Sequence, residues 1–195
     1  GSGCSAIGGY NRMHAIFGAS DQCIAVHPSD MCIALAALDA TVIITSNKGE
    51  RRIPFLNFHC LPGNTPNLDN NLQRGELITA VEIPATDAFA KNVHYLKVRD
   101  RASYAFALVS VAAALDIKGT TINNVRLAMG GVAHKPWRLL AAENFLKGKT
   151  ATAANFSQAA HLTMKDAKGY GYNNFKLGLA PNAIIESLKI ASGIS

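Results

Sequence analysis

The sequence has no apolar run of the roughly 18 to 20 residues that a membrane-spanning helix needs. Acidic residues interrupt its most hydrophobic stretches, at Asp30, Asp39 and Asp116. The catalytic signatures G-x-S-x-G, H-E-x-x-H and the Walker loop are missing. Four cysteines in a chain of 195 residues do not indicate a disulfide framework, and no C-x-x-C pair occurs among them. We therefore predict a chain without a membrane span and without an acid–base catalytic site of its own.

Charged residues are also sparse, at 16% of the 195 residues, whereas hydrophobic residues make up 49%, enough to bury a sizeable core. The 19 basic residues exceed the 13 acidic ones, but they are scattered along the chain, which argues against nucleic-acid binding. Their strongest concentration is Lys97, Arg99 and Arg101, which alternate as neighbours on one strand face do. This pattern suits a phosphate-bearing ligand or an acidic partner subunit, and equally a solvated strand face.

Residues 1–84 are predicted to form a first domain. Its opening, residues 1–28, is rich in Gly, Ser, Asn and Asp and lacks periodicity, which indicates a long ordered loop with a short strand at 23–26. A capped helix, a hairpin around a Ser-Asn-Lys-Gly turn and an alternating strand follow. These elements are expected at residues 31–38 (capped by Ser29 or Asp30), 40–53 and 76–84.

Residues 85–195 are predicted to form a second domain, in which strands come first and helices follow. Three apolar segments predict a meander of strands, at residues 94–101, 107–117 and 124–129. Three segments with helical spacing come next, at residues 138–146, 152–163 and 174–187, and Pro181 is expected to break or kink the last. A run of strands followed by a run of helices indicates an α+β fold, with helices packed against one face of a sheet.

The four cysteines differ in their surroundings. Cys32 and Cys60 lie among apolar residues and are expected to be small buried hydrophobes. Cys4 and Cys23 lie in Gly- and Ser-rich loop sequence, where ligands are more common than core residues. Together with His14 and His27 they offer two thiols and two imidazoles in one loop. From the residues alone, this loop is open to a zinc site, an iron–sulfur site or a purely structural role.

Several stretches, taken in order, resemble the flavin-binding subunits of the molybdenum hydroxylase (xanthine dehydrogenase) family. They are Ala6–Asn11, Ile24–Met31, Gly75–Pro84, Tyr95–Arg99, Tyr104–Ala112 and Gly130–Ala133. The resemblance implies the C-terminal half of a PCMH-type flavin-binding domain, followed by a CO-dehydrogenase-flavoprotein-like domain with a three-stranded antiparallel sheet and helices. The family's pyrophosphate loop is not among these residues, so we expect the chain alone to bind FAD weakly.

The resemblance also implies a set of cofactor-binding residues. For FAD these are Gly8, Gly9, Asn11, Ala25, Ser29, Asp30, Ile78, Lys97 and Tyr104. Residues 11–18 and 22–25 are similar to the branch of bacterial periplasmic aldehyde oxidoreductases whose flavin subunit also holds a 4Fe–4S cluster. Cys4 and Cys23 match two of the cluster cysteines of that branch, and the other two are expected upstream of Gly1.

The function implied by the resemblance is electron transfer within a molybdenum-dependent aldehyde oxidoreductase or xanthine dehydrogenase. Electrons would pass from iron–sulfur centres to FAD and on to a small-molecule acceptor. The expected partners are a large molybdopterin-binding subunit and a small 2Fe–2S subunit, in the bacterial periplasm rather than the cytoplasm. Two alternatives stay open: a non-catalytic module for subunit assembly, and a zinc-stabilised binding domain.

Overall fold

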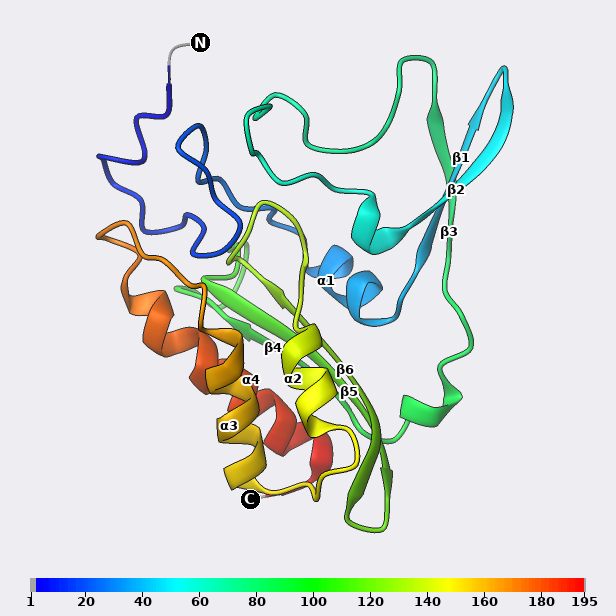
Figure 1. Ribbon diagram of the computed structural model, residues 1–195, viewed down its shortest axis with the longest axis vertical. Coiled ribbons are helices and arrows are strands. Elements are labelled where there is room, and N and C mark those ends of the chain that lie inside the picture. Colours follow the sequence, from blue (N-terminus) through cyan, green and yellow to red (C-terminus); the bar gives the residue numbers. More distant parts are fainter. Residues whose placement is uncertain (1–2, 195) are drawn as a thin grey trace.

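The computed structural model describes residues 3–194 and contains two antiparallel sheets (Figure 1). The smaller sheet has the order β2-β1-β3 and the larger has the order β4-β5-β6-β7. The strands are β1 (Thr41–Ser46), β2 (Gly49–Pro54), β3 (Leu77–Glu82), β4 (Val93–Val98), β5 (Val109–Lys118), β6 (Thr121–Gly130) and β7 (Trp137–Arg138). The helices are α1 (Asp30–Ala37), α2 (Leu140–Leu146), α3 (Ala153–Thr163) and α4 (Phe175–Ser192), with short 3-10 turns at Phe55–Asn57 and Asp87–Phe89. This architecture confirms the predicted α+β fold.

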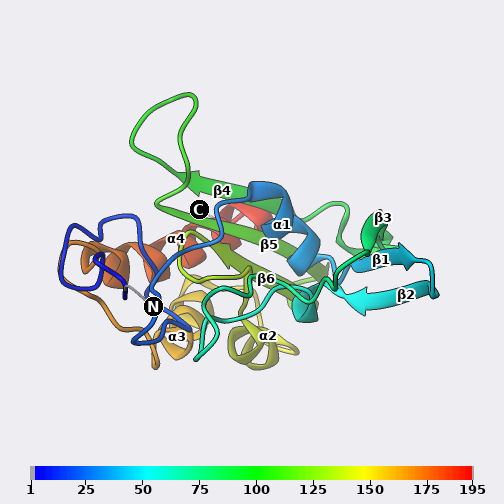
Figure 2. The ribbon, with the colours of Figure 1, turned by 90° about the horizontal axis from the view of Figure 1, so that it is seen from above.

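The larger sheet is buried on both faces, which explains the continuous apolar run of β5. Successive side chains of a strand point to opposite faces. Val111 and Leu115 pack into a core shared with α2, α3 and α4, whereas Ala112 packs into a second core with α1. The ribbon accordingly has α2, α3 and α4 on one side of this sheet and α1 on the other (Figures 1 and 2). The three-helix side holds the larger core.

The smaller sheet stands beside α1 and is covered less completely. The predicted hairpin is confirmed, because β1 and β2 pair in register from Thr41 opposite Pro54 to Ser46 opposite Gly49. Val42, Ile44 and Ile53 pack with α1 in the second core. The third strand, β3, is exposed along its whole length. The side chains that predicted a strand at residues 76–84 therefore form one without being buried by the described residues.

The structure differs from the sequence-based expectations in three local features. Residues 23–26 form no strand. The larger sheet has a fourth strand, β7, which is only two residues long and therefore carries no periodic signal. Pro181 does not break the last helix, because α4 runs from Phe175 through Pro181 to Ser192. None of the helices among residues 3–194 is both long and apolar enough to cross a membrane.

The opening loop, residues 3–29, is anchored in the C-terminal core. Ile16 and Phe17 are almost fully buried there, and the ring of Phe17 stacks on Trp137 with 5.3 Å between the centroids. The amide groups of both residues donate to the carbonyl of Val132. The loop is therefore held in place although its sequence is rich in Gly, Ser, Asn and Asp. Two buried side chains supply the anchor.

Candidate functional site

A cleft of about 610 Å³ opens between the loop that precedes α1, the end of β4 and the β4–β5 loop. Its lining includes Asp30, Lys97 and Tyr104, three of the residues expected to bind a cofactor. A smaller pocket of about 130 Å³ adjoins it and shares five lining residues. These are Met13, Pro28, Asp30, Lys97 and Phe106. The smaller pocket adds Ser29, a fourth expected residue, along with Ser110, Gly130 and Gly131.

Asp30 organises the polar side of this cleft. Lys97 Nζ donates to one carboxylate oxygen at 2.7 Å, and the Tyr95 hydroxyl donates to the other at 2.9 Å. Tyr95 and Lys97 are two positions apart on β4 and so lie on the same face of the strand. The Tyr95 hydroxyl also lies 3.1 Å from that of Ser110, and burial raises the pKa of Tyr95. A cation, a carboxylate and hydroxyls thus meet beside apolar walls.

Ser29 is positioned by the start of α1. It is the N-cap residue, in extended backbone conformation, and its hydroxyl accepts a hydrogen bond from the amide of Cys32 at 3.3 Å. This satisfies one of the amides that the first turn of a helix leaves without an intrahelical partner. The predicted cap is therefore confirmed, and it holds Ser29 and Asp30 at the edge of the cleft.

The loop from residue 99 to residue 108 forms the outer wall and projects beyond the sheet (Figure 2). Tyr104 is 97% exposed, and its φ of 50° lies in the left-handed region that residues other than glycine seldom adopt. The Arg101 guanidinium donates to the carbonyl of Tyr104 and so secures this turn. Of the alternating basic residues, Lys97 and Arg101 line the cleft, which the alternation itself could not distinguish from a solvated face.

Gly8, Gly9 and Asn11 lie elsewhere, against the loop between α3 and α4. The two glycines border a separate cleft of about 420 Å³ with Tyr170, Gly171 and Tyr172. Gly9 needs to be glycine, because a Cβ there would lie 2.6 Å from the carbonyl oxygen of Ser5. Asn11 is fully buried, and its side-chain amide donates to the carbonyls of Ala6 and Tyr170 at 3.2 and 2.7 Å. The structure therefore gives Asn11 an architectural function.

Ala25 and Ile78 complete the expected flavin-binding set. Ala25 lies in the opening loop, where its amide donates to Cys23 Sγ at 3.4 Å. Ile78 lies on the exposed strand β3 and lines neither the main cleft nor its adjoining pocket. Another cavity, of about 500 Å³, lies between α1 and β4; six of its thirteen lining residues are alanines, and none belongs to the expected set.

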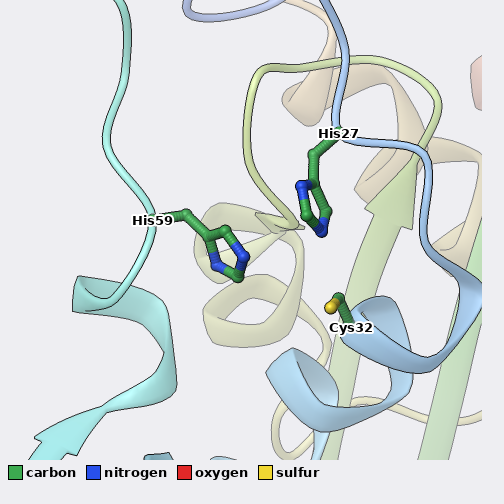
Figure 3. A group of neighbouring side chains, drawn as sticks. All are labelled: His27, Cys32 and His59. Carbon is green, nitrogen blue, oxygen red and sulfur yellow. The ribbon is translucent and has the colours of Figure 1, made fainter. Parts of the chain in front are cut away.

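Cys4 and Cys23 are half-buried free thiols in the opening loop. The hydrogen bond from Ala25 to Cys23 Sγ is of the kind that stabilises a metal-bound thiolate. The four-residue set Cys4, His14, Cys23 and His27 is not brought together. Over residues 3–194, the His, Cys, Asp or Glu side chains close enough to hold one metal ion are His27, Cys32 and His59 (Figure 3).

These three residues include two that the sequence did not identify. Cys32 was expected to be a buried hydrophobe, yet its thiol faces the rings of His27 and His59 (Figure 3). Burial lowers the pKa of both imidazoles, that of His59 to about 4. As a like charge, His27 lowers the pKa of His59 further, and His134 lowers that of His27. Both rings are therefore neutral near pH 7. The only sequence signal was His27 five positions before Cys32, and no second closely spaced ligand pair accompanies it, as a compact zinc motif would require.

A buried lysine also escaped the sequence analysis. Lys176 on α4 is fully buried, and its ammonium donates to the carbonyl of Gly131 at 2.6 Å and to that of His14 at 3.0 Å. The neighbouring Asn173 donates to the carbonyl of Ala15 at 3.0 Å. Burial lowers the pKa of Lys176 to about 8. Since Gly131 lines the smaller pocket, this contact ties that pocket to α4 and to the opening loop.

Two family models match the chain. Residues 6–86 match the FAD binding domain in molybdopterin dehydrogenase, and residues 94–173 match the CO dehydrogenase flavoprotein C-terminal domain. The chain is 45% identical over 190 residues to the aldehyde oxidoreductase FAD-binding subunit PaoB of Escherichia coli, covering 96% of this chain and 56% of the relative. It is 41% identical over 121 residues to the glyceraldehyde dehydrogenase medium chain of Sulfolobus acidocaldarius, covering 62% and 40%. The chain thus spans about half the length of these relatives.

Solved structures are similar as well. Quinoline 2-oxidoreductase from Pseudomonas putida 86 superposes with a TM-score of 0.69 at 27% identity, covering 95% of this chain and 60% of that one. Carbon monoxide dehydrogenase from Hydrogenophaga pseudoflava superposes with a TM-score of 0.72 at 22% identity, covering 96% and 60%. The second likeness, at that identity, concerns the fold alone.

Proposed function

The chain belongs to the FAD-binding subunits of the molybdenum hydroxylase family, and we propose that it forms the isoalloxazine-binding part of such a subunit. In the complete enzyme it would act in electron transfer during the oxidation of an aldehyde or a related substrate. The proposal rests on one observation: Ser29, Asp30, Lys97 and Tyr104 border one continuous cleft.

The cleft has the chemistry that a flat heteroaromatic ring requires. Met13, Pro28 and Phe106 supply apolar walls, and the aromatic side chain of Tyr104 lines the rim. Lys97 supplies a positive charge, held in place by Asp30. Bound there, FAD would accept electrons from one redox centre and release them to another. The part of this chain would be to hold the ring, to exclude water from its apolar side and to set the local charge through Lys97.

The same proposal includes the other expected residues, which line neither the main cleft nor its adjoining pocket: Gly8, Gly9, Asn11, Ala25 and Ile78. Gly8 and Gly9 border their own cleft, and Ile78 stands on an exposed strand, so these residues would meet the cofactor only through parts of it that extend beyond the main cleft. Asn11 would contribute by holding the loop that carries the glycines, because its amide is already engaged by two backbone carbonyls.

We further propose that Cys4 and Cys23 are ligands of a 4Fe–4S cluster. Both thiols are free and half-buried, and Cys23 Sγ accepts a backbone hydrogen bond. Cluster sulfurs are commonly stabilised in this way. Because Cys32 faces two histidines instead, the complete subunit would have to supply the other two cysteines. The residues present fit half of such a site.

The remaining proposals concern the whole enzyme. A large molybdopterin-binding subunit, a small 2Fe–2S subunit and a small-molecule electron acceptor are the proposed partners, with the bacterial periplasm as the proposed compartment. The family matches favour a flavin-binding subunit over the two alternatives, an assembly module or a zinc-stabilised binding domain.

Flavin titration tests the main proposal. The complete subunit should purify with a flavin absorbance spectrum, whereas this chain alone should bind FAD only weakly, since it lacks the family's pyrophosphate loop. In the complete subunit, Asp30→Ala should weaken FAD binding, while the matched change Asp166→Ala, at an exposed residue after α3, should leave it unaltered. Submicromolar FAD binding by the chain alone, or no effect of Asp30→Ala, would contradict the proposal.

Iron analysis tests the cluster. In the complete subunit, Cys4→Ser and Cys23→Ser should each lower the iron content and the broad visible absorbance of the cluster, and Cys60→Ala should not. Cys60 is a suitable control because it is half-buried like the other two, and its thiol lies 3.5 Å from the Asn71 side-chain oxygen. Full iron content in the Cys23→Ser protein would refute the assignment.

A further inference from the structure

Three side chains from separate segments converge beside α1 (Figure 3). His27 comes from the loop before the helix, Cys32 from its first turn, and His59 from the segment that follows the β1–β2 hairpin. Their candidate ligand atoms all lie within 4.8 Å of one another. The ring centroids of His27 and His59 are 4.4 Å apart.

The imidazole nitrogens here lack the hydrogen bonds that buried polar atoms ordinarily make. Among the described residues, seven buried side-chain atoms have no partner, and His27 Nε2, His59 Nδ1 and His134 Nδ1 are three of them. His59 is nine-tenths buried, and the rings of Phe55 and Phe58 close around it. An unsatisfied buried polar atom costs free energy and calls for an explanation. Two of them, on the neighbouring rings of His27 and His59, point to a shared ligand.

We infer that His27, Cys32 and His59 form a binding site for a divalent transition-metal ion of the zinc class. Two imidazoles and a thiol are the donors that zinc prefers, and three protein ligands leave the fourth position to water. Ligands held about 2.0 to 2.3 Å from a tetrahedral zinc ion lie roughly 3.3 to 3.8 Å from each other. On binding the ion, the three ligand atoms would move closer together by about one ångström, which small side-chain rotations allow.

The surroundings would support bound metal. Cys32 is in the first turn of α1, where the positive end of the helix dipole favours a thiolate. The backbone amide of His27 donates to the carbonyl of Ala133 at 3.0 Å, which fixes the end of the opening loop. Next to Ala133, His134 Nε2 lies 2.9 Å from the carboxylate of Asp69, and both groups are close enough to His27 and His59 to shift the pKa values of these imidazoles.

Metal at this position would cross-link three segments of the chain. It would join the loop before α1 to the segment after the hairpin. Its ligand His27 lies two residues before Ser29, which together with Asp30 borders the proposed flavin cleft. The metal would have a structural function, distinct from the proposed iron–sulfur cluster at Cys4 and Cys23.

Zinc binding by the full chain tests the inference. The experiment uses the chain with Cys4→Ser and Cys23→Ser, which removes the proposed iron ligands, in a reductant that does not bind metals. After gel filtration it should retain one zinc ion per chain, and titration against a chromogenic chelator gives its affinity. His59→Phe, which preserves the aromatic packing, and Cys32→Ala should each weaken binding at least about 100-fold. The matched variants His161→Phe and Cys60→Ala should bind as tightly as the parent.

Two further measurements keep the test independent of how well the variants fold. Cobalt(II) added to the parent protein should give the thiolate-to-cobalt charge-transfer absorption of a sulfur-containing site. Zinc should also raise the unfolding temperature of the parent and leave that of His59→Phe unchanged, while the metal-free forms unfold at similar temperatures. Absence of the charge-transfer band in the parent, or equal zinc affinity in His59→Phe, would overturn the inference whether or not the chain binds flavin.

Discussion

Lys176 is expected to make the stability of this chain depend on pH in an unusual range. Its side chain is fully buried on α4, and burial lowers its pKa in the folded chain to about 8, from 10.5 in the unfolded chain. The guanidinium of Arg12 lowers this pKa further. Between these two pH values the unfolded chain holds a proton on Lys176 that the folded chain has released. Stability therefore rises as the pH increases through that range.

The size of the effect follows from the shift. A change of about 2.5 pKa units corresponds to about 3 kcal/mol at 1.36 kcal/mol per unit. This contribution is fully present above pH 10.5 and is lost as the pH falls to about 8. In Lys176→Met the contribution disappears at every pH. The carbonyls of His14 and Gly131 lose their donor, at about 1 to 3 kcal/mol each, but the cost of burying a charge is removed as well.

Urea unfolding at a series of pH values measures this difference. The single tryptophan, Trp137, stacks on Phe17 and so reports the opening of the same core by fluorescence. From about pH 7 to about pH 10.5, the unfolding free energy of the parent should rise by about 3 kcal/mol relative to that of Lys176→Met. Lys165→Met, at an exposed lysine, should follow the parent throughout. Parallel profiles for the parent and Lys176→Met would refute the reasoning.

Three further changes test the cleft and the packing beneath it. In the complete subunit, Lys97→Met should lower the flavin reduction potential, because the positive charge beside the proposed ring site is lost and Asp30 remains. An unchanged potential in redox titration would contradict the placement of Lys97 near the flavin. Arg138→Met should lower the unfolding free energy in urea by about 3 to 5 kcal/mol, because it leaves the buried carboxylate of Glu143 unpaired, and a loss below about 1 kcal/mol would contradict this. Gly131→Ala should lower the unfolding temperature and reduce the unfolding free energy by about 1 to 3 kcal/mol. The φ of 73° is strained for alanine, and a Cβ would lie 2.7 Å from the carbonyl oxygen of Leu108. A variant as stable as the parent would contradict this, because it would show that the backbone shifts freely there.

The elements that the sequence predicted correctly are those specified by local chemistry. Ser29 caps α1 because its hydroxyl reaches an amide three residues ahead, and the apolar run of β5 reports burial on both faces. Other local signals were misleading or absent. Pro181 lies inside α4, where packing of Ala180, Ala183 and Ile184 in the core outweighs the hydrogen bond that proline removes. The two-residue strand β7 is too short for any period to appear.

The candidate sites depended on the tertiary structure to different degrees. The resemblance of several stretches identified Ser29, Asp30, Lys97 and Tyr104 one by one, but only the pairing of β4 with β5 and the docking of α1 on that sheet bring them to one cleft. The convergence of His27, Cys32 and His59 had no local signal, because a hairpin and 26 intervening positions separate Cys32 from His59. Lys176 likewise looks like any helical lysine until Gly131 and His14 present their carbonyls to it. Sequence patterns report what neighbours along the chain do to each other, whereas burial and ligand geometry arise from segments that only folding brings together.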